Sequence, residues 1–208
     1  MSGLPFFLLW TLAVHAACGA PLANLVWRGF HAGLTANPVE FVTHRTGDWA
    51  LNLLVACLCC TPLAKLTGDN RFVTKCRRAT GLWAYAYVCL HFLTWLWLDK
   101  EFNLADMLAD VGKRRFITAG FTALMLLTPL AITSTRGWIK RLGRKWVTLH
   151  KLIYPAALLG GIHYAWLVKK DERWPATYLG AILLLLTWRA ARAWARPGTA
   201  PSSRATAA

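Results

Sequence analysis

Residues 149–166 read LHKLIYPAALLGGIHYAW, and this stretch decides how the rest of the chain is interpreted. It is apolar enough to lie in a lipid bilayer, yet it carries His150 near one end and His163 near the other. Pro155 and the pair Gly160–Gly161 lie between the two histidines. Because ionisable groups inside a membrane are costly and usually functional, the stretch predicts a membrane helix that serves a chemical purpose.

The composition of the whole chain supports a membrane protein. Of its 208 residues, 56% are hydrophobic and only 16% are charged, and the mean hydropathy is +0.38. These values are too apolar for an ordinary soluble domain and predict several membrane spans. The twelve Trp residues agree, since Trp collects at membrane interfaces. The length allows one compact bundle without a separate globular domain.

Six apolar windows have the length of about 20 residues that a bilayer-spanning helix needs. They predict an all-α fold, a bundle of six transmembrane helices, at residues 5–27, 47–66, 80–98, 116–133, 147–168 and 174–194. Residues 16–20 have the look of a signal-peptide cleavage site, but no Lys or Arg precedes the first window, so we expect a retained helix. The tail 196–208, rich in Pro, Ser, Thr and Ala, is expected to be disordered.

The basic residues set the expected orientation of the bundle. The net charge of +15 could indicate nucleic-acid binding, but the cations lie in short runs between apolar windows, so we exclude a nucleic-acid partner. Fifteen of the 24 Lys and Arg residues, with only one acidic residue, lie in or beside three segments: the loop after the second window, the loop before the fifth, and the end of the sixth with the tail. Cations mark the cytoplasmic side, so both termini are predicted to be cytoplasmic.

Two histidines are predicted to lie at the same depth near the outer face. His91 lies eight residues before Asp99, and His163 lies six residues before Lys169. At 1.5 Å per residue their depths differ by about 3 Å, so the two rings could face each other across the bundle. Imidazole is a regular axial ligand of haem iron, and a pair on two helices provides bis-histidine ligation. The alternative is that each histidine hydrogen-bonds a neighbouring helix.

Two further histidines are candidates with less defined roles. His150 lies near the inner face, about 20 Å along the axis from His163 and about 140° around an ideal helix, although a kink at Pro155 could realign them. His44, in the motif THRTGDW at 43–49, could approach a haem edge at the outer surface, and the alternative is a solvated surface histidine. The residues alone thus place a histidine pair near the outer face and a single histidine near the inner face.

Five segments carry a resemblance to a known family. They are NPVEFVTHRTGDWAL (37–51), TPLAKL (61–66), RRATGLWAYAYVCLHFLTW (77–95), TSTRGWIKRLGRKWVTLHKLIYP (133–155) and HYAWLVKK (163–170). In this order they resemble the MsrQ (YedZ) family, the haem-binding membrane subunits of bacterial periplasmic methionine sulfoxide reductase systems, within the ferric reductase-like transmembrane group. The arginine pair before the third window and the histidines that follow make the match specific.

The resemblance implies a domain division and a set of cofactors. Residues 1–36 would form the first transmembrane helix and an outer loop, 37–195 the ferric reductase-like haem-binding bundle, and 196–208 a cytoplasmic tail. The family pattern implies b-type haem, one or two, held by His91, His150 and His163. It also implies flavin mononucleotide (FMN) and electrons drawn from the quinone pool.

The resemblance also implies a partner and a location. Electrons would leave on the outer side to a periplasmic molybdopterin-containing methionine sulfoxide reductase, the catalytic subunit of a heterodimer, which repairs oxidised periplasmic proteins. The chain would lie in the bacterial inner membrane as a multi-pass protein. It would be the electron-transfer subunit of an oxidoreductase complex, not the subunit that reduces methionine sulfoxide.

One departure from the wider group concerns the inner site. Many ferric reductase-like proteins hold two haems with paired histidines on each of two helices, but the third window here contains only His91. Arg77 and Arg78 stand where a second histidine would be expected, and arginine pairs with carboxylates or phosphates rather than iron. We therefore predict that Arg77, Arg78 or Arg144 contacts a haem propionate or a flavin phosphate. The alternative is that these cations serve membrane orientation alone.

Two other functions stay open at this point. One is a different quinol-oxidising b-type cytochrome with another acceptor, and the other is a non-redox transporter or assembly protein whose histidines are polar contacts between helices. The sequence shows no nucleophile triad, no Gly-rich phosphate motif and no nicotinamide domain, so a separate electron donor is expected. Only the fifth window has a Pro/Gly interruption and no repeat is visible, which disfavours a transporter.

Overall fold

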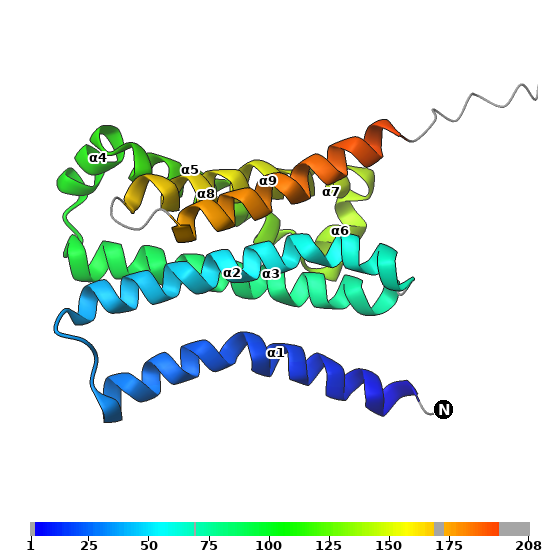
Figure 1. Cartoon of the computed structure of the whole chain (residues 1–208), viewed down its shortest axis with the longest axis horizontal. Helices are drawn as coiled ribbons and strands as arrows, with labels where there is room; N and C mark the ends of the chain where they lie inside the picture. Colours follow the sequence, from blue (N-terminus) through cyan, green and yellow to red (C-terminus); the bar gives the residue numbers. More distant parts are fainter. Residues whose placement is uncertain (1–2, 69, 169–172, 196–208) are drawn as a thin grey trace, which may run out of the picture.

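The computed structural model describes residues 3–68, 70–168 and 173–195, and this part of the chain consists of helices and their connections without a β-strand (Figure 1). The long helices lie roughly along one axis, and α4 caps one end of the bundle. In chain order the elements are α1 (Gly3–Trp27), η1 (Arg28–Ala32), α2 (Pro38–Thr67), α3 (Asn70–Leu93), η2 (Thr94–Asp99), α4 (Leu104–Lys113), α5 (Arg115–Ile132), α6 (Arg136–Leu142), α7 (Arg144–Leu149), η3 (His150–Leu152), α8 (Ile153–Leu167) and α9 (Arg173–Trp194). The all-α prediction is confirmed for the described residues.

Helix α2 begins well before the predicted residue 47, because its start signal lies further upstream. The Asn37 side chain accepts a hydrogen bond from the Glu40 backbone N–H, and Pro38 occupies the first turn, where its missing N–H costs nothing. The helix ends at Gly68, whose φ of 73° is the left-handed conformation that commonly terminates helices. As a result, His44 lies within α2 rather than at its opening.

Four helical segments are long and apolar enough to cross a membrane: Leu8–His31, Pro38–Thr67, Lys75–Asp99 and Arg115–Ile132. They confirm the first four of the six predicted spans by length and composition. Helix α8 is only 15 residues long, and α9 has 22 residues but carries polar residues at both ends. Spans five and six stay a prediction, as does the cytoplasmic location of the termini.

The fifth predicted helix, at 147–168, is interrupted by a 3-10 turn just before Pro155. In an α-helix, the ring of Pro155 would clash with the carbonyl of Lys151, four residues earlier. The chain forms the tighter 3-10 turn η3 at His150–Leu152, directly at that carbonyl, and then continues as α8. The expected interruption of this stretch is therefore confirmed, and its effect is to set His150 on a separate turn from His163.

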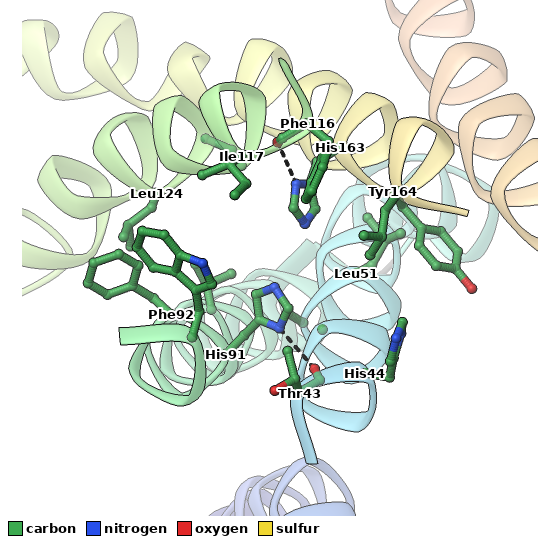
Figure 2. Close-up of a pocket in the computed structure, with 18 of the residues that line it drawn as sticks. Thr43, His44, Leu51, His91, Phe92, Phe116, Ile117, Leu124, His163 and Tyr164 are labelled. Carbon is green, nitrogen blue, oxygen red and sulfur yellow. Dashed lines mark hydrogen bonds between the residues drawn. The ribbon is translucent and has the colours of Figure 1, made fainter. Parts of the chain in front are cut away.

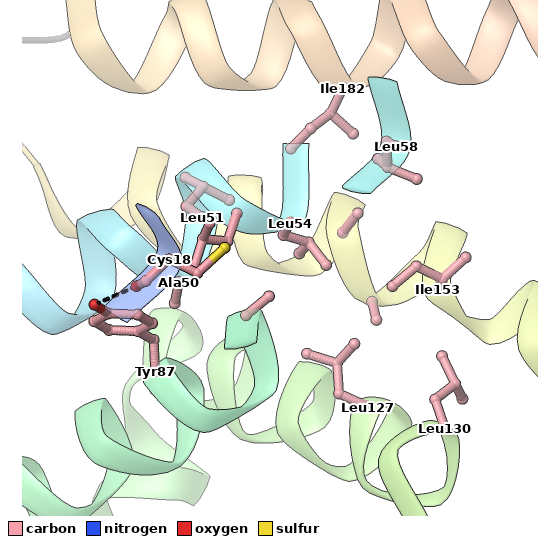
Figure 3. Packing of buried hydrophobic residues seen from close by; sticks show 14 residues of the cluster. Cys18, Ala50, Leu51, Leu54, Leu58, Tyr87, Leu127, Leu130, Ile153 and Ile182 are labelled. Carbon is pink, nitrogen blue, oxygen red and sulfur yellow. Dashed lines mark hydrogen bonds between the residues drawn. The ribbon is translucent and has the colours of Figure 1, made fainter. Parts of the chain in front are cut away.

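Helices α2 and α3 pack along each other, as do α5 and α8, and α9 covers α8. Figure 3 shows the side chains between them, among which Leu58, Tyr87 and Ile182 are almost fully buried. Ala156 and Ala157 of α8 have no exposed surface, so α8 lies in the centre of the bundle. In lipid such close packing, rather than the exclusion of water, holds helices together.

Helix α1 is attached mainly to α3. The Tyr87 hydroxyl donates a hydrogen bond of 3.0 Å to the Cys18 carbonyl, which joins the middle of the two helices. The amino-terminal end of α1 and the carboxyl-terminal end of α9 lie at the same end of the bundle, opposite to α4 (Figure 1). The predicted tail at 196–208 lies outside the described residues.

Candidate cofactor site

A cavity of about 640 Å³ opens between α2, α3, α5 and α8 at the α4 end of the bundle. This volume falls in the range of about 300–1,000 Å³ typical of cofactor and ligand pockets. Most of its wall is apolar, contributed by residues such as Leu51, Leu124 and Phe121. His91 of α3 and His163 of α8 project into it from facing sides, as Figure 2 shows. The two histidines predicted at matched depth are therefore brought together by the fold.

The two rings have the spacing of a pair of axial metal ligands. Their centres lie 5.9 Å apart and their planes make an angle of 80°. An imidazole nitrogen binds a metal at about 2 Å, so two nitrogens on opposite sides of one ion lie about 4 Å apart and their ring centres about 6 Å apart. The residues present thus fit a metal ion held between His91 and His163.

Each ring is fixed by a backbone carbonyl from another helix. The Nδ1 of His91 donates to the Thr43 carbonyl of α2 at 2.9 Å, and the Nδ1 of His163 donates to the Phe116 carbonyl of α5 at 2.7 Å. A carbonyl can only accept a hydrogen bond, so the proton of each neutral ring sits on Nδ1. The lone pair is then on Nε2, which Figure 2 shows directed toward the opposite ring, and such partners orient metal-binding histidines.

A glycine one turn beyond each carbonyl makes room for the ring. A Cβ on Gly47, four residues after Thr43, would lie 3.1 Å from His91. A Cβ on Gly120, four residues after Phe116, would lie 2.7 Å from the Nδ1 of His163. Helices α2 and α5 therefore contact the two imidazoles in the same way: a backbone carbonyl accepts a hydrogen bond from the ring, and a glycine four residues later leaves space for it.

Polar residues gather at the mouth of this cavity. His44 lines it but is exposed, and its Nε2 lies 3.8 Å from Glu40. In Figure 2 its ring lies apart from the gap between His91 and His163. Arg114 also lines the mouth, and its Nε lies 3.2 Å from an oxygen of Asp110. The sequence analysis did not single out Arg114, although its position directly before the apolar helix α5 could have indicated it.

A largely covered charge pair stabilises the α4 end of the bundle. The Lys100 ammonium lies 2.6 Å from Asp110, and both side chains are largely covered. The hydrogen bond from Lys100, assisted by the nearby Arg114 charge, holds the pKa of the Asp110 carboxyl below its ordinary value. Asp110 therefore links the residue after η2 to α4 and to the start of α5.

His150 does not share this cavity. It lies on η3, stacks on Trp146 with ring centres 3.8 Å apart, and donates from Nδ1 to the Trp146 carbonyl at 3.1 Å. Its Nε2 is buried and has no hydrogen-bond partner among the described residues. No second histidine is placed against it in that part of the chain. A buried nitrogen whose lone pair meets no donor among the described residues fits a ligand position at the end of the bundle opposite α4.

The three arginines predicted to contact a propionate or a phosphate are Arg77, Arg78 and Arg144. They lie on α3 and α7, away from α4, and all three are exposed. None of them lines the His91/His163 cavity. Their predicted role is therefore confined to the end of the bundle near His150, and it stays a prediction.

Comparison with known proteins gives the same family as the motifs. Residues 46–161 match a family model described as "Ferric reductase like transmembrane component". This match includes His91 and His150 and ends just before His163.

Several similar proteins are named as haem-binding subunits. The chain is 48% identical over 183 residues to "Protein-methionine-sulfoxide reductase heme-binding subunit MsrQ" of Xanthomonas campestris pv. campestris (strain 8004), covering 85% of this chain and 84% of that protein. A protein of the same name from Xanthomonas euvesicatoria pv. vesicatoria is 46% identical over 90% of this chain and 91% of its own. One from Bordetella pertussis is 44% identical over 86% of this chain and 88% of its own.

Proposed function

The chain belongs to the MsrQ family of ferric reductase-like transmembrane proteins, and from this premise we propose that it is the haem-binding membrane subunit of a methionine sulfoxide reductase system. The observation that carries the proposal is the facing pair His91 and His163, with ring centres 5.9 Å apart in an apolar cavity. The pair provides two Nε2 ligands, and the cavity provides a dry, apolar wall for a macrocycle.

Haem, when bound, supplies a one-electron redox couple, and the protein sets its surroundings. His91 and His163 would hold the iron through both Nε2 atoms, and a substrate would then have no free position on it. The carbonyls of Thr43 and Phe116 hold the two rings in one tautomer and increase the basicity of Nε2. A site built in this way favours electron transfer over binding of oxygen.

The mouth of the cavity is the proposed exit for electrons. Arg114 and His44 stand there, and a cation in this place would pair with a carboxylate such as a haem propionate. With the basic end of the bundle in the cytoplasm, this mouth faces the periplasm of the bacterial inner membrane. We propose that a periplasmic molybdopterin-containing methionine sulfoxide reductase receives electrons here, as the other half of a heterodimer.

The inner end is the proposed entry for electrons from the quinone pool. His150 offers its unpartnered Nε2 to a second b-type haem or another acceptor at this end. Arg77, Arg78 and Arg144 supply positive charge near it, in keeping with the proposed contacts to a propionate or to the phosphate of FMN. Loss of FMN in Arg77→Ala and Arg78→Ala with haem retained would support these contacts, and unchanged FMN in both would refute them.

The visible absorption spectrum of the purified protein tests the proposal. Oxidised and dithionite-reduced spectra are compared for wild type, His91→Ala, His163→Ala and His150→Ala, all produced with haem supplied. We expect a reduced b-type spectrum that is lost in the His91 and His163 variants and reduced at most in part in the His150 variant. A folded wild-type protein without haem would refute the electron-transfer function and favour a non-redox membrane protein.

A further inference from the structure

A second groove, of about 600 Å³, lies at the opposite end of the bundle from the histidine cavity. It opens between the end of α2, the turn η3 with the start of α8, and the end of α9. Thr43 of α2 lies at the histidine cavity and Lys65 of α2 lies at the groove, and the 22 helical steps from one to the other span about 33 Å. The lining that matters here is four cations and two aromatic rings: Lys65, Lys151, Arg189, Arg192, Tyr154 and Trp188.

The aromatic rings support the cations within this groove. The Arg192 guanidinium lies 4.9 Å from the centre of the Trp188 ring, and the Lys65 ammonium lies 5.2 Å from the same ring. The Arg189 guanidinium lies 5.7 Å from the Tyr154 ring and donates hydrogen bonds to carbonyls of α2 and α9. Cation–π contacts of this kind hold charged groups in place without neutralising them.

The lining of the groove is basic. Besides Lys65, three cations, Lys151, Arg189 and Arg192, line one opening, and none of the lining residues is acidic. Like charges at such separations repel, and the repulsion grows where lipid and protein lower the dielectric constant. An anion bound in the groove would relieve this repulsion.

The surroundings of the groove point to a lipid rather than a soluble anion. Leu184 of α9, one turn before Trp188, is 70% exposed. Such side chains face acyl chains in a membrane protein, and Trp and Tyr mark the level of the headgroups. Basic pockets between transmembrane helices on the cytoplasmic side are suited to phosphate headgroups.

We propose that this groove binds the phosphate headgroup of an anionic phospholipid. Arg192 and Lys151 contact the phosphate oxygens, Trp188 lies beneath the headgroup, and an acyl chain runs along the exposed Leu184 of α9. The proposal goes beyond the haem function and does not depend on it, because the groove shares no residue with the histidine cavity.

Native mass spectrometry of the full-length protein tests this proposal. Binding of phosphatidylglycerol is compared with binding of zwitterionic phosphatidylcholine at equal concentrations. The groove variant is Lys151→Gln with Arg192→Gln, and the matched control is Lys140→Gln with Arg141→Gln, which removes the same charge from exposed cations on α6. Each cation near an anionic headgroup contributes about fivefold, so we expect the groove variant to lose about thirty-fold in phosphatidylglycerol affinity and the control to lose less than threefold.

Three outcomes would overturn the proposal. The first is equal retention of the two lipids by the wild-type protein, and the second is an equal loss in the groove and control variants. The third is binding of inorganic phosphate or FMN that depends on Lys151 and Arg192 while phosphatidylglycerol does not bind, which would assign the groove to a soluble phosphate. If the groove variant does not fold, the salt dependence of lipid binding to the wild-type protein is measured instead. Raising the salt from about 0.1 M to 1 M shortens the screening length about threefold and should weaken the phosphatidylglycerol complex but not the phosphatidylcholine complex. Equal salt dependence of the two complexes would overturn the proposal.

Discussion

Replacing Gly120 by alanine should displace His163 and weaken haem binding, although residue 120 touches no iron. The added Cβ would lie 2.7 Å from the His163 Nδ1. Ordinary contact needs about 3.5 Å, so the ring would have to move by about 0.8 Å. That movement leads away from the Phe116 carbonyl on the same helix, and the present hydrogen bond of 2.7 Å would be lost.

The size of the effect follows from the role of this hydrogen bond. Partners that orient a metal-binding histidine contribute about 10–100-fold in metal affinity, so haem affinity should fall by about that factor in Gly120→Ala. Gly47→Ala should lose less, because its Cβ would lie 3.1 Å from His91, where a small shift of the ring is enough. The control is Gly180→Ala, since a Cβ there meets nothing within 4 Å.

The assay is titration of the purified apoprotein with haem, followed at the absorption band of the bound form. The reasoning predicts the order Gly120→Ala, then Gly47→Ala, then Gly180→Ala and wild type, from weakest to tightest. Circular dichroism should show equal helix content in all four proteins. Wild-type affinity in a folded Gly120→Ala protein would refute the claim that glycine and carbonyl together position the ligand.

Three further predictions concern other parts of the bundle. Lys100 lowers the pKa of Asp110, so the stability that this pair contributes is present above the ordinary carboxyl pKa and is lost as the pH falls below about 4. In Asp110→Asn, Tm should therefore fall less with acidification than it does in wild type. Equal acid sensitivity of Tm in the two proteins would contradict this. Tyr87→Phe removes the hydrogen bond from α3 to the Cys18 carbonyl of α1 and should lower the free energy of unfolding by about 0.6 kcal/mol, a Tm decrease of about 1–2 °C. An unchanged melting curve would show that this hydrogen bond does not contribute to stability. His150→Ala should leave the outer haem spectrum intact, and its complete loss would show that the inner and outer sites depend on each other.

The depth of the two outer histidines was predictable because a helix rises by a constant amount per residue. Counting from Asp99 and Lys169 placed His91 and His163 at one level, and the structure brings their rings together. The direction of each ring was not predictable in this way. It depends on carbonyls 48 and 47 residues away in the chain, and no periodic pattern marks a backbone atom as a hydrogen-bond partner.

The glycines behind the histidines show a similar limit. Gly47 stands in the motif THRTGDW, and nothing in that motif distinguishes a glycine that packs against a ring from a glycine in a loop. Only the helix start at Pro38 places it inside α2, and that start rests on the local cap made by Asn37. The interruption before α8 was predictable because the effect of Pro155 is local.

The most direct test of the central claim is electron paramagnetic resonance of the oxidised protein. Two imidazoles on one ferric haem give a low-spin signal, and nearly perpendicular rings make two iron d orbitals almost equal in energy, which produces strong anisotropy. With ring planes at 80°, His91 and His163 should give such a highly anisotropic low-spin signal, lost in His91→Ala and in His163→Ala. A high-spin signal in the wild-type protein, or the same low-spin signal in either variant, would contradict ligation by this pair.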